Sequence, residues 1–415
     1  MIDSILSSFP ALRHRNFRLF WFGQCISMIG IWIQNIGQAW LVLQLTKSAF
    51  KLSLVSAMQF LPMMVFALLA GTLVDKFPKR KVLIFTQTSL MILAVILASL
   101  TYFKVVQYWH VLVLALLLGI VNTLDLPTRQ SYFVEIVGRE DLMNAIVLNS
   151  TIFNLARIVG PAVAGLLIGL VGIAICFYFN ALSFLAVIAG LWMMDIPDRI
   201  IAGEDAPSPR RTITDIREGL RYIGRNAILI QPLLLLAFIS AFVMNFNVLI
   251  PVFAKQDLGK NAAGYGFLMT CMGIGSFLGA LILAARSKAG PKMTYLIGGA
   301  MGMSLLLILL GFEHHYEIAC VTLLLIGFCS ITFTALVNST IQLNSADNMM
   351  GRVMSVYSLV FGGVTPIGSL FAGNIMEYTG AQGCMVISGI IGVAATFYTI
   401  LALRRNYRND KTSTG

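Results

Sequence analysis

One charged side chain lies deep within a long apolar stretch and is the first candidate for chemistry. Arg157 stands 14 residues after Met143, near the middle of the apolar stretch 143–170, which contains no carboxylate. An unpaired guanidinium in an apolar interior would be strongly unfavourable, and charges within membrane segments usually face a wet cavity. We therefore expect Arg157 to line a water-filled cavity and to attract an acidic substrate. The alternative is that it binds backbone carbonyls freed near Pro161.

A second kind of chemistry, proton exchange, needs a membrane carboxylate that desolvation keeps partly protonated. Asp125, toward the end of the apolar stretch 109–130, is the leading candidate for proton coupling, and Glu377, at the outer end of the stretch 349–376, is the second. Arg129 follows Asp125 by one helical turn, so the two could instead form an ion pair that acts as a structural gate. The sequence gives these two roles of Asp125 equal weight.

Amide and aromatic side chains in other apolar stretches could line the same cavity as Arg157. Such side chains offer hydrogen bonds and apolar surface, which an amphipathic ligand needs together. The predicted substrate-binding residues are therefore Arg157, Gln34, Asn35, Gln38, Asn122, Asn245 and Phe246. In the alternative interpretation, several of these amides form hydrogen bonds between helices.

Membrane-spanning helices must position all of these residues. The chain has 415 residues, 58% of them apolar and only 11% charged, with a mean hydropathy of +0.84, whereas soluble domains carry roughly a quarter charged residues. Apolar stretches of about 20 residues span a hydrocarbon core roughly 30 Å thick, and in lipid they must be helical. We predict an all-α membrane protein with twelve transmembrane helices, at 19–44, 52–74, 82–103, 109–130, 143–170, 174–194, 228–253, 264–285, 293–312, 317–338, 349–376 and 384–403.

The distribution of positive charge predicts the topology. Of the 29 Lys and Arg residues, 23 fall in the segments that share one side of the membrane with the N-terminus. By the positive-inside rule that side is the cytoplasm, so both termini are expected there, in a bacterial inner membrane. The first residues lack the features of a cleaved signal peptide. The net charge of +11 therefore follows from topology, and no nucleic-acid partner is expected.

A polar stretch and a set of repeated glycines predict two related halves. The stretch 195–227 separates the sixth and seventh spans, and its part 212–225 has the pattern of an amphipathic helix. Four glycine pairs share an offset of 208 residues: Gly71 and Gly279, Gly119 and Gly327, Gly165 and Gly373, and Gly172 and Gly380. We predict a six-helix bundle at 1–194, a cytoplasmic linker at 195–227 and a second six-helix bundle at 228–415. Such parallel repeats are typical of transporters that work by alternating access.

The segment after the second span has the residues of a gate. Gly71 and Asp75 are followed by a basic cluster that includes Arg80. The segment resembles the signature loop of the major facilitator superfamily, except that Pro78 stands where that family usually has glycine. We expect Asp75 to dock on the N-terminus of the helix that begins near Arg352 and so to close the inner side. In the alternative interpretation, the cluster is only a membrane anchor.

Small residues in two other spans predict close helix packing. Gly160, Pro161 and Gly165 resemble the exporter-associated signature of the same superfamily, in which proline bends the helix and glycine admits a neighbour. Gly275 and Gly279 form a second small-residue face in the span 264–285. Tight contacts of this kind would prevent leakage between the halves. For the second face, generic helix packing is the alternative.

The segment from Asp125 through Pro127 to Arg129, followed by Arg157, resembles the macrolide and siderophore efflux branch of the major facilitator superfamily, and enterobactin-type siderophore exporters within it. The resemblance covers essentially the whole chain. It implies proton-coupled efflux of an amphipathic molecule by alternating access, and Arg157 suggests an acidic one such as a siderophore. The alternatives are a macrolide or multidrug exporter and a lysophospholipid-moving facilitator.

Several other functions are not supported by any motif. The sequence contains no GxxxxGK[ST] segment, so ATP is not expected to drive the protein directly. It contains no HExxH or GxSxG motif either, and we do not expect an enzyme. No cofactor and no metal site are expected. The expected partners are a small-molecule substrate, protons and the lipid bilayer, with the protein acting as a monomer.

Overall fold

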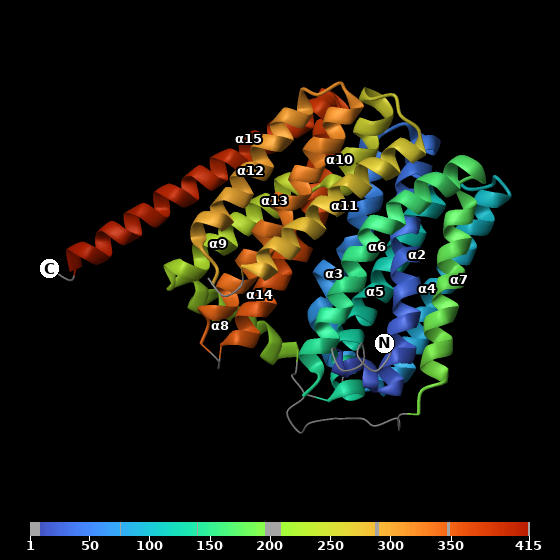
Figure 1. Cartoon of the computed structure of the whole chain (residues 1–415), viewed down its shortest axis with the longest axis horizontal. Helices are drawn as coiled ribbons and strands as arrows, with labels where there is room; N and C mark the ends of the chain where they lie inside the picture. The colour runs from blue at the N-terminus through green and yellow to red at the C-terminus, as the bar shows by residue number, and fades with distance from the viewer. Residues whose placement is uncertain are drawn as a thin grey trace. The chain divides into compact units, whose positions relative to one another are not determined.

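The computed structural model describes residues 9–74, 76–138, 140–195, 209–286, 290–346 and 349–413. These residues are almost entirely helical (Figure 1). The chain forms two compact units: unit 1 comprises Met1–Thr46 and Leu61–Pro209, and unit 2 comprises Lys47–Phe60 and Arg210–Gly415. The helix α3 (Ala49–Val74) contributes to both units, because the division falls between Phe60 and Leu61. Pro62 lies inside this helix, beside the division.

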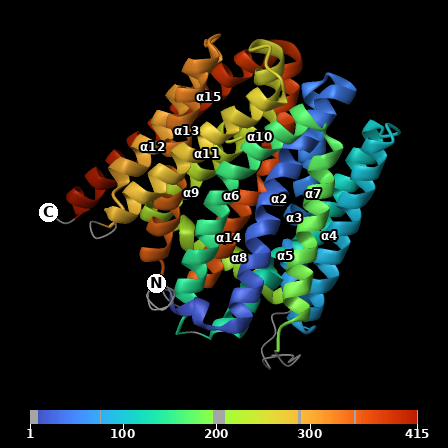
Figure 2. The ribbon, with the colours of Figure 1, turned by 45° about the vertical axis from the view of Figure 1, so that its right-hand side comes forward.

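Unit 1 is a helical bundle held by apolar and aromatic packing. Besides the end of α3 it contains a short 3₁₀ helix η1 (Pro10–Arg13), α2 (Arg15–Thr46), α4 (Lys79–Tyr102), α5 (Tyr108–Val137), α6 (Leu142–Leu170) and α7 (Ala174–Trp192). The helix α7 packs against both α2 and α4 (Figure 2). On α2, the ring of Phe20 meets Tyr132 and Phe133 of α5 edge-on, with centroids 5.9 Å and 5.7 Å apart. Edge-to-face pairs stabilise a core beyond the burial of their area.

Unit 2 contains the start of α3 and the remaining helices. These are α8 (Pro209–Gly224), α9 (Ala227–Phe238), the π-helical turn η2 (Ile239–Val243), α10 (Phe246–Val252), a second π-helical turn η3 (Phe253–Asp257), α11 (Ala262–Ala285), α12 (Met293–Gly311), α13 (Tyr316–Leu343), α14 (Met350–Gly363) and α15 (Thr365–Ser413). Helix α8 covers most of the predicted amphipathic segment. Its Ile223 is buried while Leu220 is exposed, so α8 has one apolar edge against the unit.

The last candidate membrane span holds two helices. Eleven helices of the described chain are long and apolar enough to cross a membrane, and the last of them, Met350–Arg405, is 56 residues long. Gly380 interrupts it with φ of 70° and ψ of 178°. Gly368 and Gly392, equally far from Gly380 on either side, both lie against η2. The chain therefore reverses at Gly380, a conformation that glycine adopts without strain. With this reversal, the prediction of an all-helical membrane protein is confirmed.

Candidate functional site

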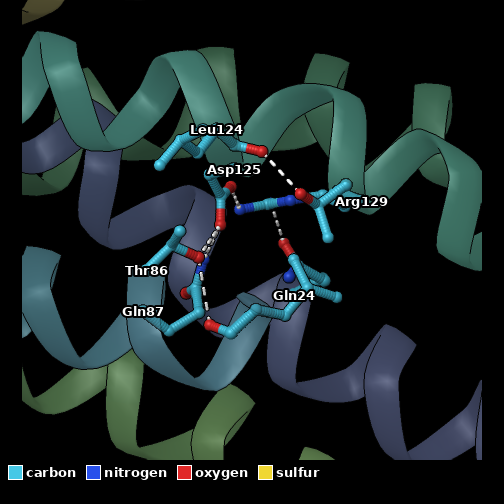
Figure 3. A network of polar contacts seen from close by, with 8 residues as sticks. Gln24, Thr86, Gln87, Leu124, Asp125 and Arg129 are labelled. Carbon is cyan, nitrogen blue, oxygen red and sulfur yellow. Dashed lines mark hydrogen bonds and ion pairs between the residues drawn. The ribbon is translucent and has the colours of Figure 1, made fainter. Parts of the chain in front are cut away.

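A buried polar network joins three helices of unit 1 (Figure 3). Thr86 Oγ1 and Gln87 Nε2, both on α4, donate to Asp125 Oδ1 of α5 over 2.7 Å and 2.8 Å. Arg129, one turn further along α5, donates through Nη2 to Asp125 Oδ2 and through Nη1 to Gln24 Oε1 of α2. Asp125 and Arg129 are only 1% and 6% exposed. The network therefore combines a buried ion pair with hydrogen bonds to neutral side chains.

Asp125 and Arg129 thus form the ion pair that the sequence offers as one of two alternatives for Asp125. The other alternative, proton coupling by Asp125, stays a prediction. The network is also incomplete. Among the described residues, Gln24 Nε2, Gln87 Oε1 and Arg129 Nε are buried without a hydrogen-bond partner. Unsatisfied buried groups of this kind cost free energy and are rare in protein interiors.

Arg157 lies on an open face of α6. Its side chain is half-buried, and within the described parts of the chain it makes no hydrogen bond or ion pair, so the predicted contact with carbonyls near Pro161 is not formed. Ile146, Ser150 and Phe153 precede it at helical spacing, and all three are exposed. The ring of Phe153 meets Trp32 of α2 with centroids 5.9 Å apart. A cation, a hydroxyl and aromatic surface therefore share one helix face.

Two of the predicted substrate-binding amides bond within the protein. Asn180 Nδ2 of α7 donates to Gln34 Oε1 of α2 over 2.7 Å, and both side chains are buried. Asn245 Nδ2 donates to the carbonyl oxygen of Ala241, one turn earlier, over 2.8 Å. The first is a contact of the alternative interpretation, in which amides form hydrogen bonds between helices, whereas the second is a local bond within one turn of the chain.

The other predicted substrate-binding residues differ in exposure. Gln38 and Phe246 are buried, Asn122 is half-buried and Asn35 is exposed. Asn35 and Asn122 therefore offer the most accessible amides of the predicted set. Their role in substrate binding stays a prediction.

The gate residues are described only in part. Gly71 lies in the last turns of α3, and Asp75 lies outside the described residues, so the predicted docking of Asp75 is not covered. Arg80 donates through Nε and Nη2 to the carbonyls of Leu191 and Trp192, over 2.8 Å and 3.1 Å. Arg80 thus binds the last carbonyls of α7, a favourable position for a cation.

Arg352 contacts the amphipathic helix α8. Its Nη1 lies 2.7 Å from Glu218 Oε2. Gly219 of α8 lies against the backbone of Arg352: a Cβ at this glycine would be 3.0 Å from the Arg352 carbonyl oxygen. Tyr222 of α8 also accepts, through its hydroxyl, a hydrogen bond from the backbone N–H of Ala346. The start of α14 and the preceding turn are therefore held by α8.

Gly160 permits close helix packing, but within unit 1 rather than between the two halves as the sequence predicts. A Cβ at Gly160 would lie 2.4 Å from Trp32 Cβ, so α6 and α2 approach where only glycine fits. Pro161 and Gly165 follow on α6, and both are buried. In unit 2, Gly275 and Gly279 lie against Leu324 and Phe328 of α13. This second small-residue face therefore packs inside its own unit, as in the alternative interpretation.

Glu377 contacts the start of α3, a contact that the sequence did not predict. Its carboxylate accepts hydrogen bonds from Ser48 Oγ and from the backbone N–H of Phe50, the latter over 3.2 Å. Both donors lie at the N-terminus of α3, where backbone N–H groups lack helical partners. Glu377 is exposed and acts as a cap contributed by another helix, rather than as a desolvated carboxylate. Its predicted proton-coupling role has no support in these contacts.

Two further contacts extend from this cap along α3 and α15. A Cβ at Gly373 would lie 1.9 Å from Ser53 Oγ, and Ser56 Oγ lies 3.1 Å from Ser369 Oγ. With Glu377, the residues of α15 recur at intervals of four, so they form one helix face. We call this face and its partners on α3 the α3–α15 contact. All of its residues belong to unit 2.

Removing the cap is expected to loosen the α3–α15 contact. A lost capping interaction costs about 1 kcal/mol, which is about five-fold in an opening equilibrium. Glu377→Ala is therefore expected to raise the labelling rate of a Ser56→Cys variant by a hydrophilic maleimide about five-fold, and Glu377→Gln less. Glu317→Ala, which removes another exposed carboxylate, serves as the control. Equal labelling in the presence and absence of Glu377 would contradict the capping role.

Comparison with known proteins agrees with this architecture. Residues 6–414 match the model of the family described as transmembrane secretion effector. The staphyloferrin A transporter of Staphylococcus aureus is 27% identical over 92% of this chain and 96% of its own length. The multidrug efflux pump Tap of Mycolicibacterium fortuitum is 25% identical over 86% and 89%. The solved structure of the nucleoside transporter NupG superimposes with a TM-score of 0.71 at 13% identity, over 94% of this chain and 98% of that chain.

At 13% identity that structure shows the fold alone, that of the major facilitator transporters. The family match covers nearly the whole chain, and its members are transporters rather than enzymes. The resemblance predicted from the segments around Asp125, Arg157 and Gly160 is thereby confirmed. The protein is a multi-pass membrane transporter of small molecules, and it belongs to the transmembrane secretion effector family, an efflux branch of the major facilitator superfamily.

Proposed function

We propose that this transporter exports an amphipathic, acidic small molecule such as a siderophore from a bacterial cell, driven by protons and by alternating access. The observation that carries the proposal is Arg157, a partly buried residue within a membrane helix whose guanidinium makes no ion pair or hydrogen bond with the described residues. A cation held in this state favours an anionic ligand, because the ligand supplies the missing hydrogen bonds. The similarity to a transporter named for staphyloferrin A supports this substrate class.

The buried network around Asp125 is the proposed site of proton coupling. A proton on Asp125 would remove the negative charge that holds Arg129, and the spare hydrogen-bonding capacity of Gln24 and Gln87 lies beside the pair. The network links α2, α4 and α5, so a change in its charge would affect three helices at once. This gives a physical route from protonation to a rearrangement of the bundle.

Alternating access is proposed to involve two six-helix halves, at 1–194 and 228–415, joined by the linker 195–227. The α3–α15 contact would serve as the outer gate, while Gly71, Asp75, Arg80 and Arg352 would serve the inner one. Close packing at Gly160, Pro161 and Gly165 would keep the pathway sealed. In this scheme the protein acts as a monomer with both termini in the cytoplasm.

A multidrug exporter is the second candidate. The aromatic pair of Trp32 and Phe153 lies one helical turn from Arg157 and offers a surface for neutral, apolar ligands. The similarity to a multidrug efflux pump supports this candidate. The two candidates differ in whether transport depends on the negative charge of the substrate.

The test is proton-driven uptake into inside-out vesicles of a matched pair of compounds, an amphipathic carboxylate and its neutral amide. Hydrogen bonds to charged groups contribute about 1.5–3 kcal/mol, so Arg157→Gln is expected to slow uptake of the carboxylate at least about tenfold. Uptake of the amide should be unchanged, and Arg157→Lys should retain part of the carboxylate uptake. Arg225→Gln, which removes an exposed cation after α8, is the charge control.

Three results are informative. If Arg157→Gln transports both compounds as the unsubstituted protein does, the acidic-substrate proposal fails and the multidrug exporter remains. If both compounds are lost equally while the protein inserts and folds normally, Arg157 acts on transport in general rather than on substrate charge. If uptake does not respond to a collapsed proton gradient, the coupling ion in the proposal is wrong.

A further inference from the structure

A groove in unit 2 is lined by none of the residues named in the proposed function. Helices α11 and α12 each pack on α13 rather than on one another, and the space between them measures about 620 Å³. Its walls are mainly apolar and include Ile282 and Leu283 of α11 and Phe328 and Leu336 of α13. Ligand pockets in proteins typically measure about 300–1,000 Å³. The groove is thus large enough for part of a lipid-sized molecule.

Glycines shape the groove. Gly279 of α11 lies against the carbonyl of Phe328, and Gly299 of α12 lies against the carbonyl of Cys329, with distances of 3.0 Å and 3.1 Å from an added Cβ. These contacts hold both helices close to α13. Gly298, the neighbour of Gly299, lines the groove and has no atom within 4 Å of an added Cβ. Part of the open space therefore results from the absence of a side chain at Gly298.

Two cations stand at one end of the groove. Arg286 directly follows α11, and Lys292 directly precedes α12. Both are exposed, both line the groove, and within the described chain neither pairs with a carboxylate. Tyr295, 47% exposed, lies beside them in the first turn of α12. Tyrosine with Lys or Arg at the end of a membrane helix is the composition found at the level of lipid headgroups.

We propose that this groove binds an anionic phospholipid. The phosphate lies between Arg286 and Lys292, and one acyl chain runs along α13 from Leu336 toward Phe328. These two residues are eight positions apart, which corresponds to about 12 Å along a helix. Charge complementarity favours an acidic lipid over a zwitterionic one, because basic pockets between membrane helices bind anionic headgroups.

A natural reporter in the groove permits a site-specific test. Cys329 lines the groove and is half-buried, and it carries a free thiol. In purified full-length protein, added phosphatidylglycerol is expected to slow the labelling of Cys329 by N-ethylmaleimide at least about five-fold, as quantified on the Cys329 peptide by mass spectrometry. Phosphatidylethanolamine with the same acyl chains should protect much less. Equal protection by the two lipids would overturn the proposal.

Variants of groove residues then test whether phosphatidylglycerol protects Cys329 by binding in the groove. Each interfacial Lys or Arg contributes about a five-fold gain in affinity for anionic lipid, so Arg286→Gln with Lys292→Gln should raise the half-protecting concentration of phosphatidylglycerol about 25-fold. Gly298→Leu places a side chain in the open space and should make labelling insensitive to lipid.

The matched controls are Arg221→Gln with Arg225→Gln for charge, and Gly169→Leu, at another glycine with open surroundings, for bulk. Wild-type protection in the double cation variant would overturn the proposal. So would protection of Cys329 by a transported compound in place of the lipid, since the groove would then belong to the transport pathway. Lipid protection is measured without transport, so its result is independent of the substrate proposed above.

Discussion

Asp125→Asn is expected to destabilise the protein by about 3–5 kcal/mol, because it leaves the guanidinium of Arg129 buried without its counter-charge. Arg129 is only 6% exposed, so water cannot replace the lost carboxylate. Arg129→Gln should have a similar effect, since it leaves the Asp125 carboxylate buried. Thermal or denaturant unfolding of detergent-purified protein would measure both. Asp141→Asn is the matched control, because the pair of Asp141 with His14 in the same unit is about a third exposed and should be worth less than about 1 kcal/mol.

The double variant Asp125→Asn with Arg129→Gln distinguishes the two roles of Asp125. Two neutral amides can keep the hydrogen bonds without an unpaired charge, so most of the lost stability is expected to return. If proton-driven transport also returns, the pair is structural. If stability returns but transport no longer follows the proton gradient, Asp125 is a coupling residue. Asp125→Asn protein as stable as Asp141→Asn protein would show that the buried pair does not hold the bundle.

Gly275→Ala is expected to produce the second large effect, a destabilisation of about 3 kcal/mol, at the upper end of what overpacking usually costs. The added Cβ would lie 1.7 Å from the carbonyl oxygen of Leu324. That oxygen belongs to the backbone of α13, so no side-chain rotation relieves the overlap and the two helices must separate. Across the same interface, a Cβ at Gly327 would lie 2.0 Å from the carbonyl oxygen of Met272. Gly327→Ala should therefore behave in the same way.

The control for this prediction is Gly298→Ala on the neighbouring helix α12, where an added Cβ meets no atom within 4 Å. Alanine also has a higher helix propensity than glycine, so this variant should be neutral or slightly stabilising. Thermal unfolding followed by size-exclusion chromatography of fluorescently tagged protein measures all three variants. An unchanged unfolding temperature for Gly275→Ala would show that α11 and α13 are not in backbone contact.

The number and type of helices could be predicted from the sequence because the backbone N–H and C=O groups of every span in lipid must be paired, which a helix achieves within one segment. The ends of the helices were harder to predict. Helix α5 continues to Val137, beyond the predicted limit at residue 130, and α13 continues to Leu343. Hydropathy measures the length that lies in hydrocarbon, whereas a helix continues for as long as its backbone hydrogen bonds do. The reversal at Gly380 was predicted by the break between the last two apolar stretches.

The candidate site could be predicted only where its partners are close in sequence. Asp125 and Arg129 are four residues apart, so their pairing was one of two interpretations of the sequence. Thr86 and Gln87 were missed, because nothing in the sequence relates the interior of α4 to that of α5. The bond between Glu377 and Ser48 joins residues 329 positions apart. Such contacts depend on the packing of whole helices, which one sequence does not specify.

The first turns of α3 contact α15, while its later turns belong to unit 1, so α3 is a helix that the two units share. If alternating access rearranges the two units as proposed, α3 would either bend or release its contact with α15. Pro62, which leaves one backbone hydrogen bond unmade, is the weakest place to bend. If Pro62→Ala makes α3 stiffer, α3 would transmit more strain to the α3–α15 contact at Ser53 and Gly373.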